Sequence, residues 1–221
     1  MNHTEIIDKT HQFLEEKFDN ESTGHDYWHM FRVWQLAKHI AAKESEHHKI
    51  DMFTLELAAL LHDVADWKFH GGDLEAGPQA ARQWLGSLDI DEAIIVHIEE
   101  IIRNVSFKGA RVANKLKTIE GQIVYDADKL DSLGAIGIAR TFAYGGATGR
   151  QLYDPAVKPE LHDNFEAYKN SQGPTINHFY EKLLLLKDKM YTNTGKQIAL
   201  HRHKVMESYL EEFYAEWNGK H

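Results

Sequence analysis

The sequence predicts an all-α fold built as a single domain. Leu, Ala, Glu, Lys and Ile, which lose little conformational freedom on entering a helix, fill long stretches of the 221-residue chain. There are only four prolines. No alternating strand pattern persists, and no internal repeat is evident. A chain of this length can bury a substantial core, so we expect one domain over residues 1–221.

Apolar residues at helical spacing predict the helices of the first half. The third of them, from Asp51 to about Trp67, contains LELAALLHDVADW and is apolar on nearly all sides, which is typical of a core helix. The loop GGDLEAGP follows, and Pro78 suits the first turn of the next helix. The expected helices cover residues 4–18, 26–46, 51–67, 78–85 and 94–102, the last introduced by Asp91.

The second half of the chain is less regular. Residues 103–117 are basic and irregular. A helix is expected from Ile119 through YDADKLD and on through LGAIGIARTF. Residues 144–174 are rich in Gly, Pro and Asn and predict a long loop excursion, and loops of that length are usually functional or mobile. The last helices are expected at 176–190 and 194–217.

Composition narrows the classes of function. The chain has no cysteine, which excludes disulfides and thiolate metal sites and suits a cytoplasmic protein. Neither a signal peptide nor a run of eighteen apolar residues is evident. A net charge of −9 argues against nucleic-acid binding through a general basic face. The fifteen histidines, with the carboxylates, are the strong ligands left for a transition metal.

Three His-Asp pairs are candidates for chemistry, and their surroundings differ. His62-Asp63 lies within an apolar segment, where ionisable groups are costly unless they are paired or bind a cation. Taken alone, the His62-Asp63 pair fits two interpretations equally well: a metal-binding pair, or a core histidine hydrogen-bonded to a neighbouring carboxylate. His162-Asp163 lies in the polar excursion and is interpreted as solvated. In His25-Asp26, Asp26 can cap the helix that carries His29.

Several motifs together resemble the HD superfamily of metal-dependent phosphohydrolases. They are His29 followed by MFRV, then LLHDVAD, then DADKLD. GHDYWH, GAIGIARTFAYGG, GRQLYDP and RHKVM…FYAEW further resemble a bacterial subgroup of small HD hydrolases, so the likeness covers most of the chain. The resemblance implies an HD-type helical bundle and an enzyme that binds a metal and hydrolyses phosphorylated substrates.

The resemblance assigns the metal ligands to His29, His62, Asp63 and Asp128. His29 is chosen over His25 because the family's histidine precedes a helical valine by four positions, as His29 precedes Val33. Asp128 directly precedes a basic residue, Lys129, as the family's aspartate does. Two imidazoles and two carboxylates suit one divalent transition metal. We expect manganese first, with Mg, Co, Ni, Fe and Zn as alternatives.

Residues near these ligands are candidates for catalysis and substrate binding. Asp66 follows Asp63 by one turn, and in HD phosphohydrolases an acid there acts on the attacking water, so Asp66 is the candidate general acid or base. The alternative role for Asp66 is to orient His62. The residues from Arg103 to Lys117 carry several cations and no acid, which could attract an anion or simply be solvated. The candidate substrate-binding residues are His25, Lys68, Lys108, Lys129, Arg140 and Arg150.

Three functions remain open from the sequence. The first is a (deoxy)nucleoside triphosphate pyrophosphohydrolase that releases a monophosphate and pyrophosphate, as the resemblance implies. The second is a nucleotide monophosphatase or phosphodiesterase on the same metal site. The third is a non-catalytic, metal-binding regulatory module. Trp28, Phe31 and Trp34 are interpreted as core or as the wall of a pocket, and a homodimer is left open.

Overall fold

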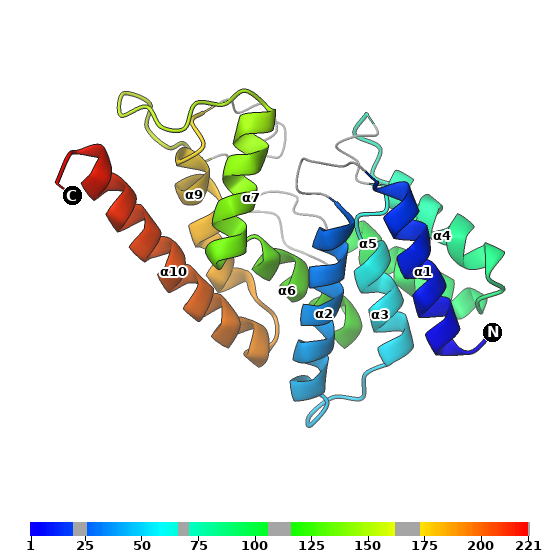
Figure 1. Cartoon of the computed structure of the whole chain (residues 1–221). Coiled ribbons are helices and arrows are strands. Elements are labelled where there is room, and N and C mark those ends of the chain that lie inside the picture. Colours follow the sequence, from blue (N-terminus) through cyan, green and yellow to red (C-terminus); the bar gives the residue numbers. More distant parts are fainter. Residues whose placement is uncertain (20–25, 66–70, 106–115, 162–172, 221) are drawn as a thin grey trace. The chain divides into compact units, whose positions relative to one another are not determined.

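The computed structural model describes residues 1–19, 26–65, 71–105, 116–161 and 173–220. Every regular element within these ranges is helical, which confirms the all-α fold class (Figure 1). The described chain divides into two compact units, one running to Asp128 and the other starting at Lys129. The expectation of one domain over the whole chain stays a prediction.

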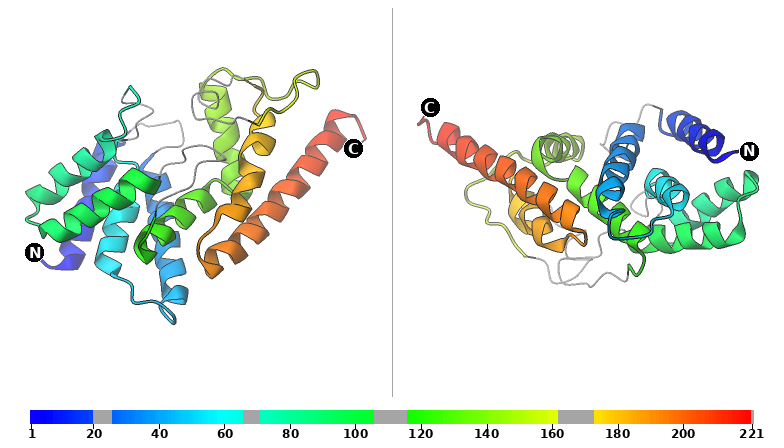
Figure 2. Two further views of the ribbon diagram at one scale, coloured as in Figure 1. Left: turned by 180° about the vertical axis from the view of Figure 1, so that it is seen from behind. Right: turned by 90° about the horizontal axis from the view of Figure 1, so that it is seen from below.

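The first unit is built around one central helix. Helices α1, α2 and α5 all pack against α3, while α4 and α5 lie side by side and are joined by a short connection (Figures 1 and 2). This arrangement accounts for the apolar composition of α3, which has neighbours on several sides. The elements are α1 (His3–Lys17), α2 (Tyr27–Glu44), α3 (Met52–Leu61), α4 (Ala76–Ser87), α5 (Glu92–Val105) and α6 (Ile119–Asp131), whose last three residues belong to the second unit.

Helix α3 begins at a capped aspartate and forms the core. The Asp51 carboxylate accepts hydrogen bonds from the backbone N–H groups of Phe53 and Thr54, two donors that the first turn of a helix leaves without partners. From Leu57 to Leu61 each side chain is fully buried. Burial of a Leu side chain stabilises a fold by about 1.5–3 kcal/mol, so this helix anchors the unit.

Helix α3 is shorter than the sequence predicts, because it ends at Leu61 and not near Trp67. His62 and Asp63 therefore lie in the turn that follows the helix and not inside it. The His62 imidazole accounts for this end: its Nδ1 lies 2.8 Å from the carbonyl oxygen of Ala59, one of the carbonyls that the last turn leaves unpaired.

The continuous helix expected from Ile119 onward is also wrong. The chain breaks after Asp131, and α7 (Gly134–Ala147) starts at a glycine with φ +72°. That left-handed conformation suits glycine, since a side chain there is strained. A Cβ at Gly134 would also lie 3.1 Å from the side chain of Arg202. The expected single helix is therefore two helices, α6 ending at Asp131 and α7 starting at Gly134.

The second unit contains the remaining helices. Helix α10 (Asn193–Trp217) packs against α7 and against the 3₁₀ helix η2 (Leu183–Lys189), which follows the short α9 (Asn177–Glu181) (Figure 1). The single helix expected at 176–190 is thus two short ones. The irregular excursion starts at residue 148 and not at 144. Its described part is tied to the chain before α9, because Thr175 N donates to Gln151 O at 2.8 Å.

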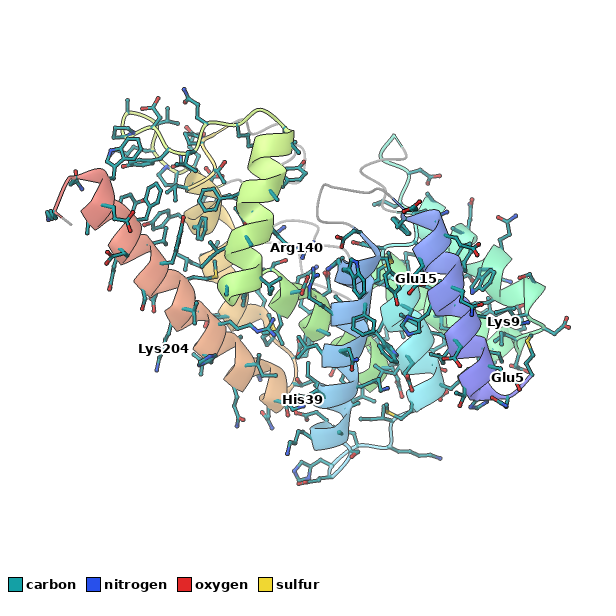
Figure 3. All side chains as sticks on the ribbon, viewed as in Figure 1. Glu5, Lys9, Glu15, His39, Arg140 and Lys204 are labelled. Atoms are coloured by element: carbon teal, nitrogen blue, oxygen red, sulfur yellow. The ribbon has the colours of Figure 1, made fainter. Side chains whose placement is uncertain are left out.

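Helix α1 is joined to the first turn of α2 by a partly buried polar contact. The His11 Nδ1 atom lies 3.0 Å from the Tyr27 hydroxyl, which is also hydrogen-bonded to the Glu15 carboxylate. A carboxylate only accepts, so Tyr27 donates to Glu15 and accepts from the His11 Nδ1–H. Burial is the main cause that raises the pKa of Tyr27 to about 12. Figure 3 labels Glu15 on α1, near this contact.

No helix in the described ranges has the length and apolar character that crossing a bilayer requires.

Two adjacent glycines of α7 give a matched test of packing. A Cβ at Gly145 would overlap the hydroxyl of Thr175, which is buried and donates to Gln151 O, whereas a Cβ at Gly146 would meet nothing. We expect Gly145→Ala to lower the free energy of unfolding by about 1–3 kcal/mol. Gly146→Ala should raise it by up to about 1 kcal/mol through helix propensity. Urea denaturation of both variants measures this, and equal effects would contradict the packing argument.

The lowered pKa of His11 predicts that the protein loses stability in mild acid. Burial among aromatic rings is the main cause that lowers the pKa of His11 below 6.5, although Glu15, Asp8 and Glu56 raise it. At pH values between the folded and the ordinary pKa, the unfolded chain binds more protons, so stability rises with pH through this window. His11→Gln can still donate to Tyr27 but does not titrate. Its free energy of unfolding should fall less than that of the wild type between pH 7 and pH 5, and parallel profiles would contradict this.

Candidate metal centre

The first turn of α2 positions His29. The Asp26 carboxylate accepts a hydrogen bond from the His29 backbone N–H at 2.8 Å, which confirms Asp26 as the helix cap. The His29 side chain is only 1% exposed. Since the cap holds the backbone of this turn, the imidazole enters the interior of the unit from a defined point on the helix.

The turn after α3 brings His62 to the same place. Its Nδ1 donates to the Ala59 carbonyl, so in the neutral imidazole Nε2 carries the lone pair. That Nε2 lies 3.2 Å from the Nε2 of His29, and the two rings meet nearly edge to face at 5.1 Å. Two buried imidazoles thus direct the same nitrogen toward a common point.

Two carboxylates border this point. Asp128 Oδ1, from α6, lies 3.6 Å from His29 Nε2 and 3.8 Å from His62 Nε2. Asp63 Oδ2 lies 3.5 Å and 3.8 Å from the same nitrogens. The imidazoles are 1% exposed, whereas the carboxylates are 16–17% exposed, so the carboxylates form the side of the group that solvent reaches.

These distances fit a bound divalent ion. With metal–ligand bonds of about 2.1 Å, neighbouring ligand atoms lie about 3.0 Å apart in an octahedron and about 3.4 Å apart in a tetrahedron. The spacings of 3.2–3.8 Å are close to both. Nitrogen lone pairs and carboxylates that face one point create a negative potential there, which a cation relieves. His29, His62 and Asp128 form a group that could hold a metal ion, with ligand atoms all within 4.8 Å of one another.

Asp63 borders the same point without belonging to that three-residue group. Its short distances to both imidazoles suit a fourth ligand, but its assignment as a ligand stays a prediction. The structure therefore brings together three of the four predicted ligands as a possible metal site, although His62 lies in a turn and not within a helix.

Several predicted site residues lie outside the described residues. They are the general acid or base Asp66 and the substrate-binding candidates His25, Lys68 and Lys108, with His162 and Asp163 of the excursion. The cationic segment that begins at Arg103 is only partly described. Arg103 forms a bidentate ion pair with Glu75 at 2.7 and 2.8 Å, so an acid distant in sequence offsets the charge of this residue.

The other three candidates lie in the second unit, and their role in substrate binding stays a prediction. Arg140 forms an ion pair with Asp131 at 2.9 Å, and Figure 3 labels it on α7. Lys129, on α6, is buried. Arg150 lies 5.8 Å from the centre of the Tyr144 ring, within the range of a cation–π contact.

Sequence reasoning missed the residues that support the ligands. The Ala59 carbonyl selects the His62 tautomer, and His11 with Glu15 holds Tyr27, two positions before His29. A backbone carbonyl carries no sequence signal. His11 lies sixteen residues from its partner, so only the packing of α1 on the first unit reveals the pair.

Comparison with known proteins agrees with this centre. A family model described as "HD domain" matches residues 27–133, which include all four predicted ligands. The uncharacterized protein YpgQ of Bacillus subtilis (strain 168) is 37% identical over 198 residues, which cover 87% of this chain and 84% of YpgQ. A structure of YpgQ, solved in complex with ADP, superposes with a TM-score of 0.75 over 98% of this chain and 97% of YpgQ, at 29% identity in that alignment.

Two further structures are similar over nearly their full lengths. An HD-superfamily hydrolase from Bacillus thuringiensis is 43% identical, with a TM-score of 0.74 over 98% of this chain and 99% of the other. A protein from Lactobacillus plantarum is 34% identical, with a TM-score of 0.84 over 99% of this chain and all of the other. Fold and site define a helical hydrolase that depends on a divalent metal. The chain belongs to the HD superfamily.

Substitution of His62 tests the metal centre. His62→Ala removes a ligand nitrogen, so metal affinity should fall by more than the roughly 10–100-fold expected when a residue only supports a ligand. His39→Ala is the matched control, because His39 is exposed on the same helix as His29, ten residues further on (Figure 3). Equilibrium dialysis against Mn²⁺, with elemental analysis, measures affinity. Equal Mn²⁺ binding by the two folded variants would contradict the assignment.

Asp63 is tested in the same assay. If Asp63 is a ligand, Asp63→Ala should lose metal to the same degree as Asp128→Ala, because both remove a carboxylate that lies within 3.8 Å of both imidazoles. A folded Asp63→Ala protein with full metal content would leave His29, His62 and Asp128 as the ligands.

Proposed function

We propose that the protein is a metal-dependent phosphohydrolase that cleaves (deoxy)nucleoside triphosphates to a nucleoside monophosphate and pyrophosphate. The observation that carries the hydrolytic part is the convergence of two imidazole nitrogens and a carboxylate at one partly exposed point. The nucleotide part is supported by YpgQ, a relative solved with ADP. We propose manganese as the preferred ion, because a mixed nitrogen and oxygen ligand set suits the divalent transition metals.

Each residue near the centre has a distinct task in this proposal. His29, His62, Asp128 and Asp63 hold the ion, and the Ala59 carbonyl keeps the Nε2 lone pair of His62 directed at it. A bound divalent ion lowers the pKa of a coordinated water and offsets charge on a phosphoryl group. Asp66 accepts the proton of the attacking water. The water oxygen bonds to the α-phosphorus, the bond from that phosphorus to the bridging oxygen breaks, and pyrophosphate leaves.

The alternatives differ in the bond that breaks. A monophosphatase or phosphodiesterase would use the same ligands and the same water but would release phosphate or open an ester. A screen of nucleoside mono-, di- and triphosphates with Mn²⁺, Co²⁺, Ni²⁺ and Mg²⁺ tests the proposal. Pyrophosphate and monophosphate in equal amounts from triphosphates support it, whereas orthophosphate as the only inorganic product would overturn it.

Asp66 is tested at saturating metal. If it takes the proton of the attacking water, Asp66→Asn should lower kcat by roughly 10²–10⁴ with little change in metal affinity. The loss should appear in kcat more than in KM, since the interaction belongs to the transition state. If Asp66 instead orients His62, metal affinity should fall roughly 10–100-fold and excess metal should restore the rate. Unchanged turnover at saturating metal would require another base.

A further inference from the structure

Trp28 is exposed and adjoins the predicted metal ligand His29 in the sequence. It directly precedes His29 in the first turn of α2, and 58% of its surface is exposed. Of the two interpretations of this residue, core is therefore wrong, and the wall of a pocket stays a prediction. A single exposed aromatic residue is common on protein surfaces. Trp28 differs from such residues because it directly precedes a predicted metal ligand on the same helical turn.

The exposed ring is held in place by its neighbours. Trp28 meets the Tyr27 ring edge to face with centroids 5.1 Å apart, and the Phe31 ring at 5.7 Å. The Tyr27 and Phe31 rings lie 6.1 Å from each other, so the three rings form one cluster that restricts the rotation of the indole while most of its surface stays in contact with water. An ordered but exposed ring loses little further freedom when a ligand covers it.

The two neighbouring rings are themselves anchored. Tyr27 is 8% exposed, and its hydroxyl is bonded to His11 and Glu15. Phe31 lies 5.6 Å from the ring of Trp34, whose Nε1 donates to Glu56 at 2.8 Å. Helix α1 and helix α3 therefore both contribute to the orientation of Trp28, through Tyr27 and Phe31.

Helix geometry places a basic residue, Arg32, at a register position close to Trp28 and His29. At about 100° per residue, Arg32 projects between the directions of Trp28 and His29, one turn further along α2. A helical side chain leans toward the turn on the N-terminal side of its own Cα, so Arg32 leans toward the turn that holds Trp28 and His29.

We propose that Trp28 stacks on the base of a nucleotide whose phosphates reach the metal centre. This inference rests on the proposed function, because it names the contact for the part of the substrate that the metal ligands do not hold. Stacking is tolerant of base identity, since every base has a π-face. The contact therefore selects nucleotides over other phosphorylated compounds without selecting strongly among the bases.

Kinetics of Trp28 variants test the proposal. Base stacking on an aromatic side chain strengthens nucleotide binding. Trp28→Ala should therefore raise KM for all nucleoside triphosphates by roughly 5- to 100-fold. Trp28→Phe keeps a stacking surface and should recover most of the affinity. The inhibition constant of inorganic tripolyphosphate, which has no base, should not change. Val96→Ala, which trims another exposed apolar side chain of the first unit, is the control for loss of exposed surface.

A binding experiment separates this proposal from the proposed function. ADP is titrated into the Mn²⁺-loaded protein, and tryptophan fluorescence is recorded for the wild type and for Trp28→Phe; quenching should be largely lost in the variant. Metal content and the melting temperature are measured for every variant. If Trp28→Ala keeps its metal and hydrolyses nucleotides with unchanged KM, the stacking proposal is overturned while the proposed function stands. If ADP quenches Trp28 but no nucleotide is hydrolysed, the proposed function fails and the stacking proposal stands.

Discussion

The metal centre depends on two imidazole nitrogens held 3.2 Å apart in a buried place. Such an arrangement is unfavourable unless a proton or a cation lies between them, because lone pairs and nearby carboxylates repel one another. The fold maintains it through contacts that are independent of the ion. Asp26 caps the turn that carries His29, and the Ala59 carbonyl fixes the tautomer of His62. The protein thus presents a preorganised ligand set, which favours metal binding over rearrangement of the site.

The central position of α3 explains how residues from three segments meet. Because α1, α2 and α5 all pack on this helix, the turn after its last residue lies among several elements. His29 reaches this turn from α2, and Asp128 reaches it from α6. The fully buried stretch from Leu57 to Leu61 therefore also positions the turn that carries His62. A substitution in this stretch should affect both stability and metal affinity, since both depend on the same packing.

The first turn of α2 combines a predicted metal ligand with aromatic residues of contrasting burial. The same turn contains a buried ligand at His29, an anchored ring at Tyr27 and an exposed ring at Trp28. Successive residues of a helix project in different directions, so one turn can serve the core, the neighbouring helix and the solvent. The homodimer and the cytoplasmic location stay predictions.

Hydrophobic periodicity was enough to predict the helical fold class and most helix positions, because it is a local signal. The resemblance to the HD superfamily pointed to His29, His62 and Asp128, which the structure brings together. The sequence pattern placed His62 and Asp63 inside a helix, since a propensity pattern does not reveal a helix end that a histidine caps. Only the tertiary structure decided that Arg103 pairs with Glu75, that His11 holds Tyr27, and that Trp28 is exposed. Those outcomes depend on which residues distant in sequence become neighbours, and burial and pairing are properties of that packing.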